Sequence, residues 1–299
     1  MLPITTPFKP DETLDLDALG SNIRQWNETG IAGYVILGST GERVHLDETE
    51  YAEVVSRARA EVPEHLRFIV GAGQQSTRGT INEIIRVRAK STIDAALVIT
   101  PSFYRTSITQ SSLIDFYSSV ADESPVPIIL YSMPALTGIK IEPETTAQLG
   151  EHDNIIGIKD SSADVDGLTK TMNGVRNDFT VLTGNGTVLD QALQAGASGA
   201  ILAVGCVAPK LCIEILEAVK AGDVSRATRL QEDLSPLAAA VTTRFGIGGL
   251  KTAMDLIGYS GGFVRSPLRM PDEECRREII KCLQDAEDAL RRRDFIPAG

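Results

Sequence analysis

Short apolar runs alternate with longer amphipathic segments along most of the chain. The runs are rich in Ile and Val and almost continuously apolar, which is typical of parallel strands covered on both faces. They predict eight strands, at residues 2–6, 33–37, 67–71, 95–100, 127–131, 155–159, 179–183 and 198–204. Eightfold alternation of strand and helix predicts the α/β class and, within it, a (β/α)8 TIM barrel; a doubly wound open sheet is the alternative.

The segments between and after these runs predict helices. Residues 46–60 and 77–90 repeat their apolar positions with helical spacing, and Asp47 followed by Glu50 predicts a capping box for the first. Four more helices are predicted after the last strand, at residues 209–221, 223–244, 248–257 and 272–292. A barrel needs only one closing helix, so we expect a barrel over residues 1–221 and a C-terminal helical extension over residues 222–299, packed on the barrel.

Composition excludes several kinds of partner. The 299 residues carry a net charge of −11, which does not suit nucleic acid or an anionic membrane surface, and we expect neither. No apolar stretch approaches the roughly 18 residues of a membrane span. The first residues lack the basic region of a secretory signal, so a cytoplasmic location is expected, with organelle import behind a removed presequence as the alternative.

The cysteines and histidines do not suggest a metal site. Cys206, Cys212, Cys275 and Cys282 all lie in the last third of the chain without a CxxC pair, which is typical of reduced thiols. The three histidines are scattered among polar segments. We therefore expect no bound metal and no metal-dependent chemistry.

Lys159 is the first candidate for chemistry. It ends an apolar run, and a buried amine either pairs with a carboxylate or loses its proton. A neutral amine in an apolar site forms Schiff bases with ketones. Tyr131 ends the preceding predicted strand, so the two residues predict imine chemistry with a phenol as proton carrier. A solvated strand end for the lysine and a barrel-wall position for the tyrosine are the alternatives.

Hydroxyl side chains and glycines collect at the predicted strand ends, where TIM barrels place their active sites. The segments are residues 5–7, 38–42, 100–105, 131–134, 159–162 and 183–186. Hydroxyls and free backbone N–H groups hold carboxylates, so this composition predicts an anionic substrate. Taken alone, residues 38–42 (GSTGE) equally fit a tight turn and a helix cap.

Three motifs give the chain a resemblance to a known family. They are residues 38–42 (GSTGE), 131–138 (YSMPALTG) and 157–161 (GIKDS). In them, and over nearly its whole length, the chain resembles the dihydrodipicolinate synthase / N-acetylneuraminate lyase family of class I aldolases. Residues 100–105 (TPSFYR), 130–134 (LYSMP) and 240–262 (AVTTRFGIGGLKTAMDLIGYSGG) make it most similar to the 4-hydroxy-2-oxoglutarate aldolases of that family.

The resemblance implies roles for individual residues. Lys159 is the Schiff-base lysine, so no further cofactor is needed, and Tyr131 is the general acid–base group. The substrate-binding residues are Ser39, Thr40 and Gly41 for the keto-acid carboxylate, Ser161 and Thr5 for further polar contacts, and Leu136, Asn185 and Val204 for the shape of the aldehyde pocket. The implied partners are pyruvate, an aldehyde and further copies of the chain in a homotetramer of tight dimers.

Two departures from the family pattern matter for function. Phe103 stands where relatives usually place a tyrosine that serves the neighbouring subunit's proton relay, so we expect the adjacent Tyr104 to replace it as a catalytic residue, or the relay to be shorter. Leu136 stands where lysine-pathway synthases carry an arginine for the aldehyde's carboxylate, and a leucine cannot form that bidentate pair. Asn185 lies in a segment without the acidic pair of sialic-acid lyases.

The best single hypothesis is an aldolase that cleaves or forms a 4-hydroxy-2-oxo acid, with 4-hydroxy-2-oxoglutarate giving pyruvate and glyoxylate. The enzymatic alternatives are a 2-keto-3-deoxy sugar-acid aldolase or dehydratase and then dihydrodipicolinate synthase. A non-catalytic keto-acid-binding homologue is the alternative from another class. A nicotinamide-dependent reductase has no GxGxxG segment after a strand to support it.

Overall fold

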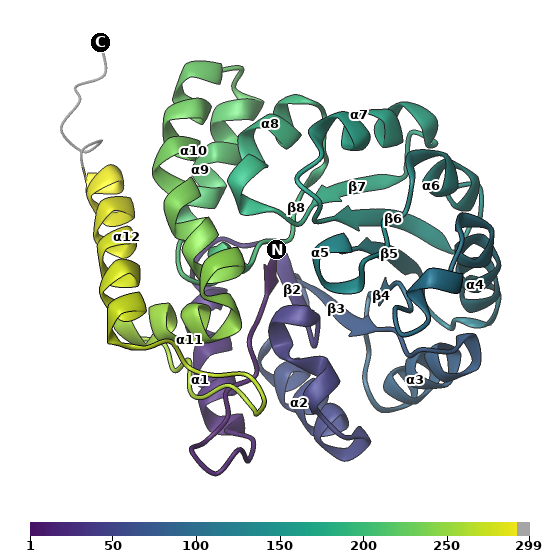
Figure 1. The fold of residues 1–299 in the computed structure, drawn as a ribbon, viewed down its shortest axis with the longest axis horizontal. Helices are drawn as coiled ribbons and strands as arrows, with labels where there is room; N and C mark the ends of the chain where they lie inside the picture. The colour runs from purple at the N-terminus through teal and green to yellow at the C-terminus, as the bar shows by residue number, and fades with distance from the viewer. Residues whose placement is uncertain (292–299) are drawn as a thin grey trace.

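The structure is a computed structural model and describes residues 1–291. Over these residues eight parallel strands follow one another around a single sheet in sequence order (Figure 1). The strands are β1 (Leu2–Pro3), β2 (Gly33–Ile36), β3 (Arg67–Ala72), β4 (Ala95–Ile99), β5 (Ile128–Ser132), β6 (Ile155–Asp160), β7 (Thr180–Thr183) and β8 (Gly199–Ala200). The backbone joins the last strand to the first, because the Met1 amine donates to the Ala200 carbonyl at 2.9 Å and the Leu202 N–H donates to the Met1 carbonyl at 3.2 Å. The predicted TIM barrel is confirmed.

Helices surround this sheet. They are α1 (Leu16–Asn27), α2 (Glu48–Glu61), α3 (Thr77–Lys90), α4 (Gln110–Glu123), α5 (Pro134–Thr137), α6 (Pro143–Leu149), α7 (Val165–Gly174), α8 (Leu189–Gln194), α9 (Pro209–Lys220), α10 (Val224–Ala239), α11 (Gly246–Leu256) and α12 (Glu273–Arg291). Short 3-10 turns are η1 (Ser39–Gly41), η2 (Arg43–His45), η3 (Arg105–Ser107), η4 (Gly186–Val188) and η5 (Ala203–Cys206), and η6 (Ala240–Arg244) is a π-helical turn.

Local sequence explains why the predicted helices form. At the start of α2 the Asp47 carboxylate accepts from the Glu50 N–H at 2.9 Å, and the Glu50 carboxylate accepts from the Asp47 N–H at 3.2 Å, so the predicted capping box is present. Helix α3 has the predicted bounds, residues 77–90. None of the helices within residues 1–291 combines the length and apolarity needed to cross a bilayer, and the cytoplasmic location stays a prediction.

The apolar side chains form two clusters on the two faces of the sheet. The larger one lies between the sheet and the helices and includes Trp26 and Tyr34, both fully buried. The smaller one lies inside the barrel and includes the strand residues Val35 and Ile129 and, just after β8, Ile201. Because the interior is filled by side chains, a ligand reaches the strand ends rather than passing through the barrel.

Three predicted elements differ from the structure. The strand predicted at residues 2–6 is ordered as a strand only over Leu2–Pro3. The strand predicted at residues 198–204 is ordered as a strand only over Gly199–Ala200, because the chain leaves the sheet after Ala200 and forms η5 from Ala203 onward. The helix predicted at residues 223–244 is α10 followed by the π turn η6, after which α11 begins. Helix α12 ends at Arg291, and the last predicted helical residue, 292, lies outside the described residues.

The helices after the barrel lie together on one side of the molecule. In Figure 1 helices α9, α10 and α12 stand side by side at the left with α11 below them, and α10 packs against both α9 and α12. Helix α11 contacts η5, the turn that follows β8, so the C-terminal helices reach the strand-end side of the barrel. A division at residue 221 between barrel and extension stays a prediction.

Candidate active site

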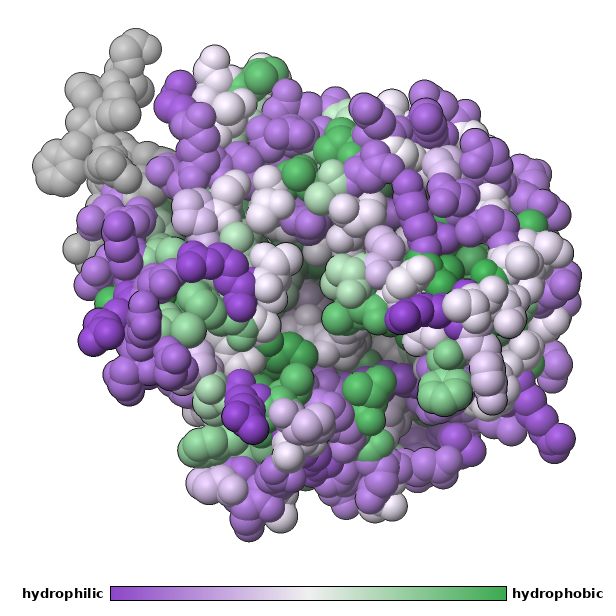
Figure 2. Space-filling view, viewed as in Figure 1, coloured by the Kyte–Doolittle hydropathy of each residue, from purple (hydrophilic) through white to green (hydrophobic). Residues whose placement is uncertain are grey.

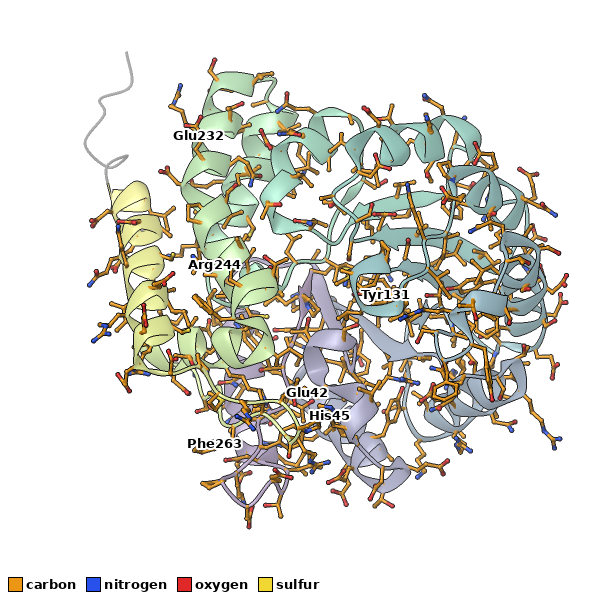
Figure 3. The ribbon with its side chains drawn as sticks, in the orientation of Figure 1. Glu42, His45, Tyr131, Glu232, Arg244 and Phe263 are labelled. Atoms are coloured by element: carbon orange, nitrogen blue, oxygen red, sulfur yellow. The ribbon has the colours of Figure 1, made fainter. Side chains whose placement is uncertain are left out.

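Lys159 and Tyr131 lie side by side at the ends of neighbouring strands. The two residues are paired in register across β6 and β5, and the Lys159 Nζ lies 4.2 Å from the centre of the Tyr131 ring. Each is only 4% exposed. Figure 3 shows Tyr131 among the strand ends near the middle of the barrel. The apolar runs that predicted the strands therefore place an amine and a phenol together in a nearly dry environment.

The surroundings of Tyr131 favour its ionised form. Burial by itself raises the pKa of the phenol, but the neighbouring Lys159 ammonium opposes this, as do hydrogen bonds with the side chains of Ser39, Lys159 and Ser161. Together they hold the pKa of Tyr131 below its usual value of 10.0. A phenol of this kind exchanges protons more readily near neutral pH than an ordinary tyrosine does.

Gly184 gives the lysine room. It follows β7, and its N–H donates to the Asp160 carbonyl at 2.6 Å. A Cβ atom at this position would lie 2.0 Å from the Ser161 Oγ and 2.7 Å from the Lys159 Cε. Since real Cβ atoms do not come this close to their neighbours, only glycine allows Lys159 and Ser161 to occupy their observed positions.

The residues after β2 form a tight turn with available donors. This turn, η1, holds Ser39, Thr40 and Gly41, and the first N–H groups of a helical turn have no partner within it. The Gly41 carbonyl accepts from the Thr6 hydroxyl at 2.7 Å, which ties the turn to the segment after β1. The N–H groups of Ser39 and Thr40 and their hydroxyls therefore suit an anionic oxygen.

A cavity of about 1360 Å³ opens at this end of the barrel. Of the predicted site residues, Ser39, Tyr131 and Leu136 line it, whereas Lys159 and Ser161 do not, and many of the other lining residues belong to α2 and α3. Figure 2 shows the face hollowed near its centre, with hydrophobic residues around the hollow. Leu136 lies on the short helix α5 and is 64% exposed, so it presents an apolar surface at the rim.

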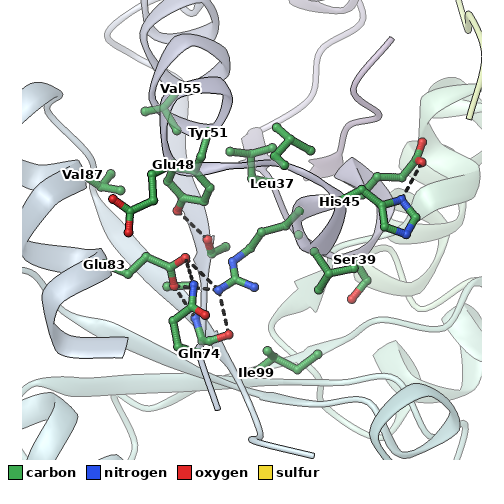
Figure 4. A pocket seen from close by; sticks show the side chains of 18 of the residues that line it. Leu37, Ser39, His45, Glu48, Tyr51, Val55, Gln74, Glu83, Val87 and Ile99 are labelled. Atoms are coloured by element: carbon green, nitrogen blue, oxygen red, sulfur yellow. Dashed lines mark hydrogen bonds and ion pairs between the residues drawn. The ribbon is translucent and has the colours of Figure 1, made fainter. Parts of the chain in front are cut away.

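One wall of the cavity is polar, and sequence reasoning assigned it no role. Glu83 accepts from the Arg43 guanidinium at 2.7 Å, from the Gly73 N–H at 2.8 Å and from the Gln74 amide at 2.9 Å (Figure 4). The Tyr51 hydroxyl donates to the Gly71 carbonyl at 2.8 Å beside this group. No local motif announces the cluster, because Arg43 and Glu83 belong to different helical segments forty residues apart.

Other predicted site residues have different surroundings. Tyr104 and Phe103 are 70% and 77% exposed and contact each other edge to face, with ring centres 5.0 Å apart. Thr5 is buried, and its hydroxyl lies 3.5 Å from the Met254 sulfur. Val204 is buried beside the backbone of Gly186. The roles of these residues in substrate binding or proton transfer stay predictions.

The arrangement of potential metal ligands is a further feature of the described residues. Within residues 1–291 there is no group of three or more His, Cys, Asp or Glu side chains that could hold a metal ion. The four cysteines are free thiols, and Cys206 is fully buried.

Comparisons with known proteins fit this geometry. A model of the dihydrodipicolinate synthetase family matches residues 1–286. The chain is 33% identical to the 4-hydroxy-tetrahydrodipicolinate synthase of Methanothrix thermoacetophila, with 95% of each protein covered. It is 34% identical to the enzyme of the same name from Methanopyrus kandleri, covering 93% of this chain and 94% of the relative. These relatives are named for that synthase activity and not as 4-hydroxy-2-oxoglutarate aldolases, so the finer assignment is a proposal.

Solved structures show the same architecture. The dihydrodipicolinate synthase of Thermotoga maritima matches with a TM-score of 0.89 and 30% identity, covering 96% of this chain and 97% of that one. YagE, an Escherichia coli K12 prophage protein of the same family solved with pyruvate, matches with a TM-score of 0.87, 30% identity and the same coverage. The chain thus belongs to the dihydrodipicolinate synthetase family of pyruvate-dependent class I aldolases, carbon–carbon lyases that form a Schiff base with a lysine and use no metal cofactor.

Proposed function

We propose that this protein cleaves or forms 4-hydroxy-2-oxo acids through an imine on Lys159, with 4-hydroxy-2-oxoglutarate giving pyruvate and glyoxylate as the main reaction. The observation that carries the chemistry is the Lys159 Nζ placed 4.2 Å from the ring of Tyr131, with both side chains buried. The observation that carries the substrate class is the apolar Leu136 at the cavity rim.

The proposed reaction begins when the Lys159 ammonium gives up a proton and the resulting amine attacks the C2 ketone. Return of that proton to the new hydroxyl group lets water leave, which forms an iminium ion. The electrons of the C3–C4 bond then move into the iminium and form an enamine. The proton of the C4 hydroxyl goes to Tyr131, and the C4 fragment leaves as the aldehyde glyoxylate. Protonation of the enamine at C3 and hydrolysis of the iminium release pyruvate and the free amine.

The keto-acid carboxylate is assigned to η1. Ser39 and Thr40 offer hydroxyls and backbone N–H groups there, and the Ser39 side chain is among the groups that lower the pKa of Tyr131. Binding the carboxylate beside the phenol would place C2 between Tyr131 and Lys159. This arrangement converts a collision between amine and ketone into a reaction within one complex.

The aldehyde assignment rests on Leu136. The aldehyde partner of a lysine-pathway synthase carries a carboxylate distant from its aldehyde carbon, which a cation would hold, and leucine supplies none. Glyoxylate brings only a carboxyl group next to the aldehyde carbon, which polar groups near the imine, such as Ser161, can meet. We therefore place glyoxylate ahead of larger acidic aldehydes.

A 2-keto-3-deoxy sugar acid is the second candidate substrate. Polar side chains that line the cavity near Tyr131 favour it, because a sugar acid brings several hydroxyl groups that need partners. Thr100 and Ser102 line the cavity and could meet sugar hydroxyls, and the Thr100 hydroxyl has no hydrogen-bond partner within the described residues.

The deciding experiment is borohydride trapping followed by an aldehyde screen. Incubation with pyruvate and borohydride, with peptide mapping, should yield a reduced pyruvyl adduct on Lys159. Pyruvate formation from 4-hydroxy-2-oxoglutarate should exceed that from 2-keto-3-deoxy sugar acids in kcat/KM. Lys159→Ala should give neither adduct nor turnover. A folded wild-type protein that forms no adduct would contradict the whole assignment. A higher kcat/KM for a sugar acid would mean that the sugar acid, and not 4-hydroxy-2-oxoglutarate, is the substrate.

We also place the active form in a homotetramer. Phe103 and Tyr104 expose two aromatic rings on the loop after β4, and large apolar side chains on a loop are explained most simply by burial against another subunit. Light scattering should give four times the chain mass of 32.1 kDa. A monodisperse monomer with full activity would remove the neighbouring subunit, and Tyr104 with it, from the mechanism.

A further inference from the structure

A buried ion pair lies directly behind the η1 turn. Glu42 follows Gly41 in the chain, and its carboxylate lies 2.6 Å from the Nζ of Lys251 on α11. Both side chains have no exposed surface. Two charges withdrawn from water remain stable only when each is paired and hydrogen-bonded. This pair therefore requires well-placed partners for both side chains.

Lys251 is held in its protonated form by geometry. Its Nζ donates to the Glu42 carboxylate at 2.6 Å, to the Thr6 carbonyl at 2.7 Å and to the Phe263 carbonyl at 2.5 Å. Burial lowers the pKa of this amine, and the Glu42 carboxylate opposes the shift. Three acceptors match the three N–H groups of an ammonium, whereas a neutral amine has only two.

The second carboxylate oxygen of Glu42 is also occupied. It accepts from the Arg265 backbone N–H at 3.0 Å and lies 3.2 Å from the His45 Nδ1. Figure 3 shows Glu42, His45 and Phe263 grouped on the same side of the barrel. The pair thus joins residues after β1, the turns after β2, helix α11 and the segment that follows it.

The contacts of Glu42 and Lys251 also hold the backbone of the η1 turn. Glu42 has a left-handed backbone with φ of 53°, a conformation that a glutamate keeps only when its surroundings hold it. Its N–H donates to the Ser39 carbonyl at 3.2 Å, which closes the turn. Thr6 accepts from Lys251 with its carbonyl and donates to the Gly41 carbonyl with its hydroxyl. Lys251 therefore restrains the turn from both sides.

We infer that Lys251 and Glu42 are positioning residues that hold the Ser39–Gly41 turn in the shape that receives the keto-acid carboxylate. The inference rests on the proposed function, because it assigns that carboxylate to this turn. Neither residue touches the reacting carbons. Loss of the pair should therefore weaken binding of the keto acid in the ground state and leave the chemical step at Lys159 and Tyr131 nearly intact.

The test measures trapping of pyruvate by borohydride as a function of pyruvate concentration. We expect Lys251→Met and Glu42→Gln to raise the half-saturating pyruvate concentration at least about tenfold, the effect of losing one good hydrogen bond to a charged group. The amount of adduct trapped at saturating pyruvate and the value of kcat should both stay within about threefold of wild type. The reason is that the variants lose binding energy equally in the ground state and the transition state. The matched control is Lys220→Met, which removes an exposed lysine paired with Glu217 at 3.1 Å and should change nothing.

The double variant Glu42→Gln/Lys251→Met separates positioning from stability. Lys251→Met alone strands a buried carboxylate and can unfold the protein, whereas the double variant leaves no buried charge unpaired. If the pair positions the turn, the double variant regains thermal stability but keeps the raised half-saturation. Half-saturation that returns to the wild-type value together with stability would overturn the inference. Failure of the wild-type protein to trap pyruvate at all would instead refute the proposed function.

Discussion

Replacing Gly184 by alanine tests whether Lys159 needs its observed position. The new Cβ would lie 2.7 Å from the Lys159 Cε, whereas ordinary van der Waals contact begins at 3.4 Å. The Ser161 Oγ, at 2.0 Å from the same Cβ, can rotate away, but the lysine chain must retreat by about 0.7 Å. A displacement of this size moves the amine away from the line of attack on the ketone.

The expected loss follows from the cost of misplacing a reacting group. A shift of about 1 Å costs roughly 10²-fold in rate, so Gly184→Ala should lower kcat by about 30- to 100-fold. The assay is single-turnover imine formation with pyruvate, followed by borohydride quenching at timed intervals. The rate of adduct formation should fall by the same factor as kcat, because the slowed step is attack by Lys159.

Gly174→Ala supplies the matched control. Gly174 ends α7, and a Cβ there would meet the Ala147 Cβ at 3.3 Å, close enough that the neighbour must give slightly but far less than Lys159 must at Gly184. This variant should keep wild-type rates. Imine formation at the wild-type rate in a folded Gly184→Ala protein would refute the reasoning, because it would mean that Lys159 reacts from a position other than the one described.

Three further predictions concern the site and its support. Tyr131→Phe should still form the pyruvate adduct but lose roughly 10²–10⁴ in cleavage rate, measured as kcat, because the proton carrier is gone. Since the pKa of Tyr131 lies below its usual value, kcat should rise with pH through a limb below pH 10, as the phenolate forms, and Tyr131→Phe should lack that limb. Gly157→Ala puts a Cβ 2.4 Å from the Thr180 carbonyl and should cost about 1–3 kcal/mol of unfolding free energy in a denaturant titration.

Each of these three predictions would be contradicted by a specific outcome. Retained cleavage in Tyr131→Phe would move proton transfer to another group, with Tyr104 the first to test. A pH limb that survives the substitution would belong to a residue other than Tyr131. Unchanged stability of Gly157→Ala would show that β6 and β7 can separate without cost beside Lys159.

Much of the barrel could be predicted because each strand carries its own signal. Strands β2 to β7 coincide with apolar runs to within one or two residues, and the Asp47–Glu50 pair marked the start of α2. The end of β8 could not be predicted in this way. Residues 201–204 are as apolar as a strand, and apolarity alone does not separate a strand from a buried 3-10 turn such as η5.

The residues of the site also include some that the sequence could predict and some that it could not. Lys159 and Tyr131 were predictable because each ends a strand, and parallel strands bring their ends to one edge. Lys251 was not, because a lysine in a helical segment gives no sign of a carboxylate partner 209 residues away. The partnership of Arg43 with Glu83 was hidden for the same reason. Long-range pairing of charges depends on packing between elements, which a local pattern does not encode.

The place of Leu136 on α5 has a consequence for how this family can diversify. Helix α5 is four residues long and lies outside the sheet, so residue 136 takes part in no hydrogen bond between strands. With 64% of its surface exposed, its side chain can change size or charge without repacking the interior. Under the proposed assignment of the aldehyde to this rim, substitutions at residue 136 can change the aldehyde partner while the amine and phenol beneath keep the same chemistry.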